Sequence, residues 1–494
     1  MIIYKTNNSN TYQALWLVIS SFSSFTLSII SAAILSRYFD KEEYGTYRQI
    51  LYVYNTLLVI FSAGLPNIFS YYLPRYNLAK GKDLVWKITK MLLFFGALFS
   101  LFLFACSEFI AGVLKNPELK IGMKYFSPIP LLLMPTLGIE GIFATYRKTI
   151  YVAIYNTLTR VLMLAFIVLP VIIFKGTYLY AIYGWIISSI ITLILAYVFK
   201  NKPFEGITLE RSGLRFKDIF LFSLPLLMSS IFGMAIRAAD QFYISRFFGT
   251  VVFAEFSNGF IQLPFAQMIT AAVSTTLLPV FSKLIFIKAE HKLILELWQN
   301  TLNKSAIIIY PMVIFFIFYA KESIIILYSN KYEPSTVYFI ISMLINFFNV
   351  IAFAPLILAM GETKFYARLH LGYAISSWIN GYIIVTLFRT PVAISIFSAM
   401  QSILLVLTSL FFISKKTNIY YFDLFPIVKL SIIALHSIIA IIFIKILFSN
   451  FLQITIFNIY LIIMAFISYI IILLLTAPFF KINYAILFKA ILNK

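Results

Sequence analysis

The sequence contains little charge, and acidic residues are especially scarce. Asp and Glu account for 18 of the 494 residues, and all charged residues together make up 12%. Hydrophobic residues make up 62%, and the mean hydropathy is +0.94. Soluble domains carry about 25% charged residues, whereas apolar runs of about 20 residues cross a bilayer as helices. The composition therefore excludes a soluble protein and predicts an all-α polytopic membrane protein.

Cysteine and histidine are also nearly absent. The single cysteine, Cys106, permits no intrachain disulfide and no cysteine metal cluster. The three histidines lie far apart in the sequence and form no His/Glu cluster with one another, so no metal site is expected. The sequence has no glycine-rich phosphate loop ending in Gly-Lys-Ser or Gly-Lys-Thr, which argues against an ATPase. We therefore expect no cofactor, no metal and no enzymatic activity.

What the sequence has in abundance is long apolar runs. They predict about fourteen transmembrane helices, at 12–35, 47–73, 88–106, 122–145, 150–174, 177–199, 219–244, 251–279, 303–320, 335–359, 368–388, 392–413, 427–448 and 452–475. If the N-terminus is cytoplasmic, the cytoplasmic segments hold more than twice as many Lys and Arg residues as the opposite side. Because cytoplasmic loops collect basic residues, we expect both termini in the cytoplasm. This distribution accounts for the net charge of +21 without nucleic acid.

A short pattern occurs twice. Ser36, Arg37 and Phe39 recur as Ser245, Arg246 and Phe248, an offset of 209 residues (245 − 36). Six spans separate the two copies, so both halves enter the membrane in the same direction, as in a parallel transporter repeat. We predict four segments: a six-helix bundle at 1–199, a cytoplasmic linker at 200–218, a second six-helix bundle at 219–413, and helices 13 and 14 with a cytoplasmic tail at 414–494.

Several local motifs resemble those of bacterial polysaccharide flippases, the O-antigen and capsule branch of the multidrug/oligosaccharidyl-lipid/polysaccharide exporter superfamily. The motifs lie at 34–39, 43–47, 64–66, 71–75, 224–227, 237–242 and 248–249. The chain departs from the family pattern at Phe39-Asp40, where an apolar-Gly pair is usual. The resemblance implies two six-helix bundles around a V-shaped cavity, lined mainly by the first, second, seventh and eighth helices. It also implies location in the bacterial cytoplasmic (inner) membrane and a substrate of undecaprenyl diphosphate-linked oligosaccharide, flipped to the outer leaflet by alternating access.

Such a substrate requires cationic and hydrogen-bonding side chains, because arginine pairs well with phosphate. The candidate substrate-binding residues are Arg37, Arg48, Asn67, Arg75, Arg237, Asp240, Arg246, Gln262 and Gln267. For Arg237 and Asp240, three residues apart on one helix face, a mutual ion pair is an equally good interpretation. We expect Arg160 to form a structural pair with Glu140. Pro66, Pro225 and Pro264 are candidate hinges, because proline removes a helical hydrogen bond.

Two other functions fit parts of the sequence. One is an ion-coupled exporter of organic cations from the same superfamily, although the few carboxylates within spans argue against it. The other is a polysaccharide polymerase or ligase, for which the outer loops are short. The expected partners are a polyprenyl diphosphate-linked oligosaccharide and membrane lipids, with no nucleic acid, and the chain is expected to work as a monomer. A coupling proton or sodium ion is expected for this superfamily, but no residue identifies the ion or the sugar.

Overall fold

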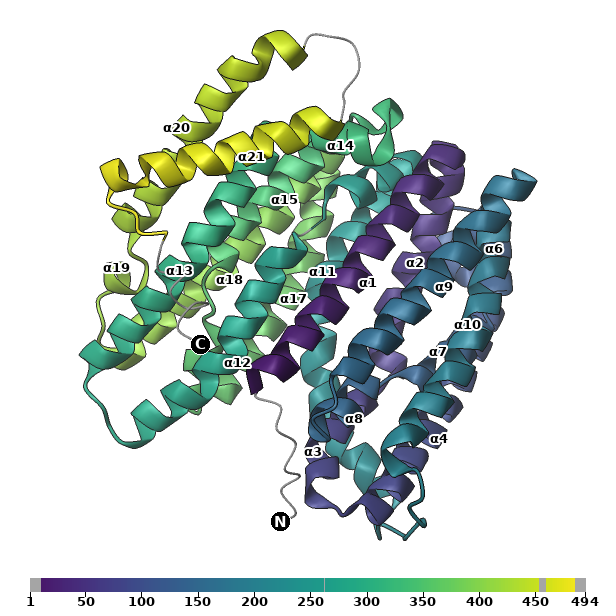
Figure 1. Cartoon of the computed structure of the whole chain (residues 1–494). Helices are drawn as coiled ribbons and strands as arrows, with labels where there is room; N and C mark the ends of the chain where they lie inside the picture. The colour runs from purple at the N-terminus through teal and green to yellow at the C-terminus, as the bar shows by residue number, and fades with distance from the viewer. Residues whose placement is uncertain (1–9, 262, 453–458, 485–494) are drawn as a thin grey trace. The chain divides into compact units, whose positions relative to one another are not determined.

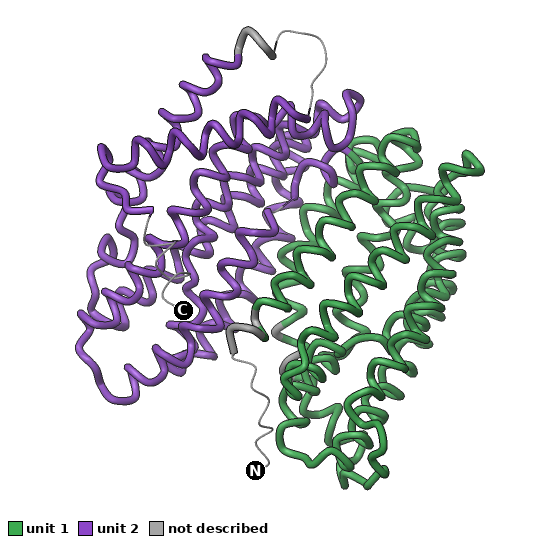
Figure 2. Tube along the Cα trace, in the orientation of Figure 1, with its two compact units in different colours: residues 1–254 green, residues 255–494 purple. Residues whose placement is uncertain are grey.

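The computed structural model describes residues 10–261, 263–452 and 459–484, and all regular secondary structure in these ranges is helical (Figure 1). The prediction of an all-α fold is thus confirmed. The chain divides into two compact units, unit 1 (Met1–Ala254) and unit 2 (Glu255–Lys494) (Figure 2). Each unit is described separately below.

Unit 1 contains the helices that surround the candidate site. They are α1 (Asn10–Tyr38), α2 (Lys41–Phe61), η1 (Leu65–Asn67), α3 (Ile68–Tyr72), η2 (Leu73–Arg75), α4 (Leu78–Ala105), α5 (Ser107–Leu114), α6 (Glu118–Phe126), α7 (Ile129–Leu133), η3 (Met134–Thr136), α8 (Ile139–Thr145), α9 (Ile150–Phe174), α10 (Tyr178–Asn201), η4 (Lys202–Phe204) and most of α11 (Phe216–Gly259). The pairs α1–α9 and α9–α10 form the most extensive helix packing in this unit.

Unit 2 contains the remaining helices. They are α12 (Pro264–Phe286), α13 (His291–Phe318), α14 (Ala320–Tyr328), η5 (Asn330–Tyr332), α15 (Ser335–Asn349), α16 (Ala354–Ala359), α17 (Thr363–Phe388), α18 (Pro391–Thr417), α19 (Tyr421–Leu424), α20 (Ile427–Leu452), α21 (Ile459–Thr476) and η6 (Ala477–Phe480). The last two long helices pack on α13, where the Tyr469 hydroxyl donates to the Pro311 carbonyl at 3.1 Å. His436 on α20 is buried and lies 2.7 Å from the Thr476 hydroxyl, a contact between helices.

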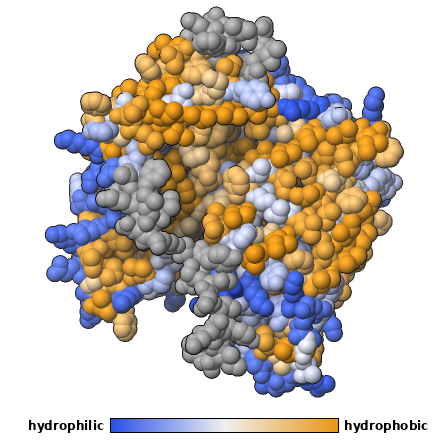
Figure 3. All heavy atoms as spheres, in the orientation of Figure 1, coloured by the Kyte–Doolittle hydropathy of each residue, from blue (hydrophilic) through white to orange (hydrophobic). Residues whose placement is uncertain are grey.

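The described residues contain 12 helices that are long and apolar enough to cross a membrane, or 13 if the bent pair Lys41–Phe61 and Leu65–Arg75 is one span. Each of the fourteen predicted spans overlaps a helix, and the span at 219–244 lies in α11. Figure 3 shows a largely hydrophobic surface over α9 and α10, with hydrophilic residues gathered at helix ends. Ile154, Leu158 and Leu169 on α9 and Ile194 on α10 are exposed, as side chains that face lipid would be. The chain is a multi-pass membrane protein.

Two predicted spans are present but are not continuous helices. The span at 47–73 bends by 57° after α2, where Gly64 has a φ of 69° and Pro66 follows. The span at 122–145 divides into α6, α7, η3 and α8, with Gly138 at a φ of 88°. Hydropathy averages over such breaks, whereas left-handed glycines and prolines interrupt the backbone hydrogen bonds.

The helical backbone is interrupted at the equivalent position in both copies of the sequence repeat. In the first copy α1 ends, and Asp40 caps α2 by accepting from the Glu43 N–H at 2.7 Å. In the second copy Gly249, 209 residues later (249 − 40), has a φ of 81° and kinks α11. A glycine tolerates this angle, whereas the extended Asp40 uses its carboxylate as a cap. The agreement is local, and the parallel relation of the two halves stays a prediction.

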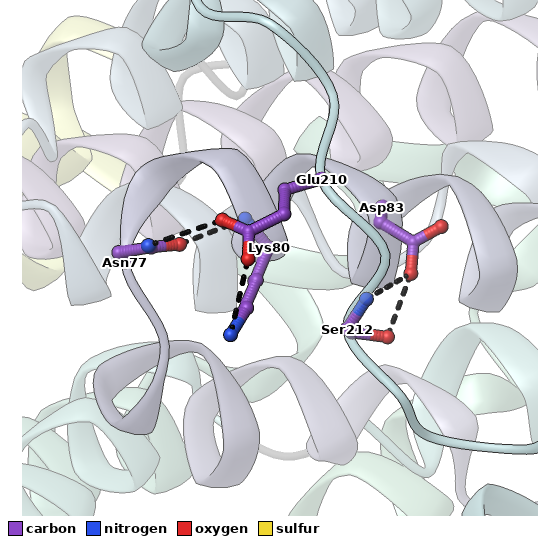
Figure 4. Close-up of polar contacts among 5 residues, drawn as sticks. All are labelled: Asn77, Lys80, Asp83, Glu210 and Ser212. Carbon is purple, nitrogen blue, oxygen red and sulfur yellow. Dashed lines mark hydrogen bonds and ion pairs between the residues drawn. The ribbon is translucent and has the colours of Figure 1, made fainter.

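The predicted linker is fastened to unit 1. Asp83 on α4 accepts hydrogen bonds from the Ser212 N–H at 2.8 Å and the Ser212 hydroxyl at 2.7 Å (Figure 4). Lys80 on the same helix lies 3.2 Å from the carboxylate of Glu210. These contacts place the linker beside α4 of unit 1. The boundary between the two compact units lies after the linker, between residues 254 and 255. Because compact units need not coincide with halves of a repeat, the predicted segment boundaries stay a prediction.

A buried lysine secures the break before α8. Lys200 on α10 is 2% exposed, and its ammonium donates to the carbonyls of Pro135 at 2.6 Å and Leu137 at 2.8 Å. It also lies 3.2 Å from the Thr89 hydroxyl on α4. The helix break leaves these carbonyls without helical donors, so the lysine satisfies them. Lys200 thereby fixes the segment that forms one wall of the site described below.

Replacing Lys200 with methionine is expected to lower the free energy of unfolding by about 1–3 kcal/mol, the cost of leaving buried polar groups without partners. Thermal unfolding of the detergent-purified full chain measures this change. Lys202, an exposed residue whose ammonium lies 4.4 Å from the Tyr151 ring, provides the control. Its methionine variant is expected to lose about 1 kcal/mol or less. Equal destabilisation by the two variants would contradict a specific role for Lys200.

Candidate functional site

Unit 1 contains two adjoining cavities. The larger has a volume of about 690 Å³ and is lined by α1, α2, α8, α9, α10 and the short segments between them. The smaller has a volume of about 250 Å³ and is lined by α1, α2, α9 and α10. Five residues line both: Tyr54, Asn55, Arg160, Met163 and Trp185. The two cavities therefore meet at a shared wall, and we call them the large and the small chamber.

Arg160 stands where the chambers meet. It lies on α9, within a candidate membrane span, and its side chain is exposed. Its Nη1 lies 3.9 Å from the sulfur of Met163, one turn along the helix. Among the residues that the structure describes, no carboxylate forms an ion pair with it. An arginine within a span costs roughly 2.5–3.5 kcal/mol to insert, so such residues face a cavity or a partner. Here it faces the cavities.

The expected structural pair of Arg160 with Glu140 is wrong. Glu140 also lines the large chamber, but its Oε1 accepts a hydrogen bond from the Asn156 amide at 3.1 Å. The same amide donates to the Ser20 hydroxyl at 2.8 Å. Glu140 is therefore held by a neutral network joining α1, α8 and α9. The sequence placed both residues at similar depth, but only the helix rotation decides whether two side chains meet.

The remaining lining of the large chamber includes polar and aromatic side chains beside aliphatic ones such as Leu17 and Leu58. Asn55 and Asn67 are exposed, and the hydroxyl of Thr192, a residue 5% exposed, has no hydrogen-bond partner within the described ranges. The indole of Trp185 donates to the Tyr47 hydroxyl at 2.8 Å, which fixes the ring between the chambers. Amide and hydroxyl groups bind polar ligands in either the donor or the acceptor role. The chamber thus combines one cation, Arg160, and one carboxylate, Glu140, with neutral hydrogen-bonding groups.

Tight helix packing positions these groups. Gly184 on α10 lies so close to α9 that a Cβ atom there would overlap the Phe166 carbonyl oxygen. Across the other face of α9, the Thr157 hydroxyl donates to Ser23 on α1 at 3.0 Å, and Thr149 donates to the Gln13 side chain at 2.7 Å. Small residues and interhelical hydrogen bonds of this kind hold membrane helices together. They fix the rotation of α9 and with it the direction of Arg160.

The structure places some of the sequence-predicted residues at the chambers. Arg48 lines the small chamber, and Asn67 and Pro66 line the large one. Pro66 lies in η1, next to the 57° bend. Arg37 is exposed in the last turn of α1 and lines neither chamber. Arg75 is exposed in η2, with its guanidinium 3.6 Å from the centre of the Tyr71 ring.

The other predicted residues lie elsewhere. Arg237 on α11 is exposed and has no ion pair within the described ranges, so a mutual pair with the buried Asp240 is not formed. Arg246 donates to the Val113 carbonyl on α5. Gln267 is exposed on α12 of unit 2, Pro264 begins that helix, and Pro225 lies within α11. Gln262 lies outside the described residues. The roles of these residues in binding or hinging stay predictions.

Comparison with known proteins identifies the family. A profile described as polysaccharide biosynthesis protein matches residues 12–285, more than half of the chain. The chain belongs to the polysaccharide biosynthesis protein family. The resemblance seen in its motifs is thereby confirmed at the level of the family. No match was found among curated protein sequences.

Several solved structures have the same fold as this chain. It resembles the lipid II flippase MurJ in an inward closed conformation, with 16% identity, a TM-score of 0.71, and coverage of 94% of this chain and 99% of that one. It also resembles an inward-facing multidrug resistance MATE family transporter of the MOP superfamily, with 11% identity, a TM-score of 0.60, and coverage of 80% and 94%. A third is a MOP superfamily transporter from Pyrococcus furiosus, at 12% identity, a TM-score of 0.57, and coverage of 82% and 96%. At these identities the similarity establishes the fold.

Proposed function

We propose that this polysaccharide biosynthesis family member is a flippase that moves an undecaprenyl diphosphate-linked oligosaccharide, an O-antigen or capsule unit, from the cytoplasmic to the outer leaflet by alternating access. The observation that supports it most is Arg160, a cation without a carboxylate partner among the described residues, facing two cavities inside a membrane-spanning unit. A cation that faces a cavity within a membrane span and has no carboxylate partner there favours an anionic ligand.

The chemistry of the substrate explains why such cavities are needed. An isolated charge transferred into hydrocarbon costs tens of kcal/mol in the idealised limit, so a diphosphate cannot cross unaided. Polar walls replace the water that the head group loses, while the polyprenyl chain stays in the lipid. Arginine contributes paired hydrogen bonds to phosphate oxygens. The polar side chains of the large chamber supply donors and acceptors for sugar hydroxyls.

Several further properties belong to the same proposal. The bend next to Pro66 is a place where α2 and α3 can change their angle during alternating access. We infer location in the bacterial inner membrane, with both termini cytoplasmic, and operation as a monomer without catalytic activity. A coupling proton or sodium ion is expected, and no described residue is assigned to it.

A second candidate function has one observation in its favour. Glu140 places a carboxylate in the large chamber, and the fold is shared with a MATE family transporter. An exporter of organic cations would use such a carboxylate to bind its cargo. Arg160 in the same cavity opposes this function, because like charges repel at short range.

Transport by the purified full chain in proteoliposomes distinguishes the two functions. Undecaprenyl diphosphate-linked oligosaccharide is incorporated, and the sugar exposed on the outside is oxidised by a membrane-impermeant reagent such as periodate. A flippase makes all of the sugar accessible, whereas protein-free vesicles protect about half of it. Accumulation of ethidium without any increase in accessible sugar would overturn the flippase proposal and support the cation exporter.

A further inference from the structure

Both chambers lie wholly within unit 1. Their lining residues all belong to α1–α3, α7–α10 and the segments between these elements. The family resemblance instead implies a cavity between two bundles, to which the seventh and eighth helices contribute. The larger volume of about 690 Å³ falls within the range of small-molecule sites, roughly 300–1,000 Å³. Unit 1 therefore holds a site of ligand size by itself.

The two chambers differ in charge. The small chamber is lined by two arginines, Arg48 and Arg160, and no Asp or Glu is among its lining residues. Serine and tyrosine side chains, including Ser28, Ser31 and Tyr47, complete its polar wall. Arginine and hydroxyl groups suit a phosphate, because a fully ionised phosphate has hydrogen-bond acceptors and no donors. The small chamber has the composition of an oxyanion site.

The large chamber has the composition of a carbohydrate site. Its polar groups are mostly neutral, and its one carboxylate, Glu140, is an acceptor for hydroxyl groups. Trp185, shared by both chambers, offers an aromatic face for the apolar side of a sugar ring. The hydroxyl of Thr192 is buried in the wall of this chamber without a partner in the described part of the chain. A polar ligand that forms a hydrogen bond with such a buried hydroxyl removes the free-energy cost of leaving it without a partner.

We propose that the chambers together bind a phosphorylated sugar within unit 1, with the phosphate between Arg48 and Arg160 and the sugar in the large chamber. The inference rests on the proposed function for its natural ligand, the sugar-phosphate portion of a lipid-linked oligosaccharide. Arg160 joins the two subsites, because it lines both. Arg48 belongs to the phosphate subsite alone.

Calorimetric titration of the detergent-purified full chain tests this site with glucose 1-phosphate as the probe. The Arg160→Gln variant is expected to bind about 10- to 100-fold more weakly, the loss that corresponds to one charge-assisted hydrogen bond. Arg48→Gln is expected to weaken binding in the same direction. Arg147→Gln, at an exposed position between α8 and α9 that lines neither chamber, is the matched control and is expected to bind as the wild type does. Thermal unfolding confirms that each variant is folded, and Arg160→Lys, which keeps the charge, is expected to bind with intermediate affinity.

Three ligands separate the parts of the proposal. Glucose 1-phosphate is expected to bind more tightly than either inorganic phosphate or glucose, because only the phosphorylated sugar fills both subsites. Equal affinity for inorganic phosphate and glucose 1-phosphate would overturn the sugar subsite. Equal affinity of the wild type and Arg160→Gln would overturn the site as a whole.

The site and the flippase proposal fail in different ways. Binding of glucose 1-phosphate that depends on Arg160, in a protein that does not flip the lipid-linked oligosaccharide, would support the site and overturn the flippase. Flipping that is unaffected in Arg160→Gln, in a protein that does not bind glucose 1-phosphate, would support the flippase and overturn the site.

Discussion

Replacing Gly184 with alanine is expected to destabilise unit 1 by about 3 kcal/mol or more, at the upper end of the usual cost of overpacking. The new Cβ would overlap the carbonyl oxygen of Phe166, a backbone atom that cannot move without separating α9 from α10. Because these helices carry Arg160 and Trp185, transport is expected to be lost along with stability. Thermal unfolding of the purified full chain measures the first effect, and the proteoliposome assay measures the second.

Gly372 provides the matched control for this substitution. It lies at an exposed position of α17, and a Cβ there meets nothing within 4 Å. Gly372→Ala is expected to be neutral or to stabilise the helix by up to about 1 kcal/mol, since alanine is the better helix former. If Gly184→Ala unfolds at the same temperature as Gly372→Ala, the close packing of α9 and α10 is refuted.

Replacing Met163 with glutamate is expected to lower flipping of the lipid-linked oligosaccharide by about tenfold or more. Met163 is 9% exposed, lines both chambers, and its sulfur lies 3.9 Å from the Arg160 guanidinium. A carboxylate three residues away on the same helix face would pair with Arg160 and compete with the phosphate of the substrate. The proteoliposome flipping rate measures the effect.

Met163→Gln is the isosteric neutral control, and its flipping rate is expected to remain close to that of the wild type. Both variants should unfold near the wild-type temperature, which separates a blocked site from a misfolded protein. If Met163→Glu flips the lipid-linked oligosaccharide at the wild-type rate, Arg160 does not bind the substrate. Faster ethidium transport by this variant would instead favour the cation exporter.

The helical content and the approximate positions of the spans follow from local sequence. Apolar runs such as 150–174 and 177–199 became α9 and α10 with nearly the predicted bounds, because a bilayer imposes helix on any long apolar segment. The bend within 47–73 lies next to Pro66, a candidate hinge, whereas the break within 122–145 was not predicted. They depend on the left-handed conformations of Gly64 and Gly138, which hydropathy does not register, and on Lys200, which satisfies the freed carbonyls from another helix.

The candidate site was only partly accessible from the sequence. Arg48 and Asn67 were predicted and line the chambers, whereas Arg160 was assigned to a pair with Glu140 that the structure does not form. The signal for Arg160 was present, since a lone arginine near the middle of an apolar span needs a partner or a cavity. Which of the two applies depends on the rotation of α9, and that rotation is set by the packing of Gly184 against Phe166.

Composition alone was enough to make this chain a helical membrane protein, because only helices satisfy their own backbone hydrogen bonds in lipid. Its motifs, confirmed by the family profile, were enough to identify the family. Contacts between helices far apart in the chain decided the separation of two chambers and the neutral network around Glu140. They also decided the location of Arg160, a cation with no carboxylate partner among the described residues. Such contacts depend on helix rotation and on close backbone approach, which no local pattern of residues encodes.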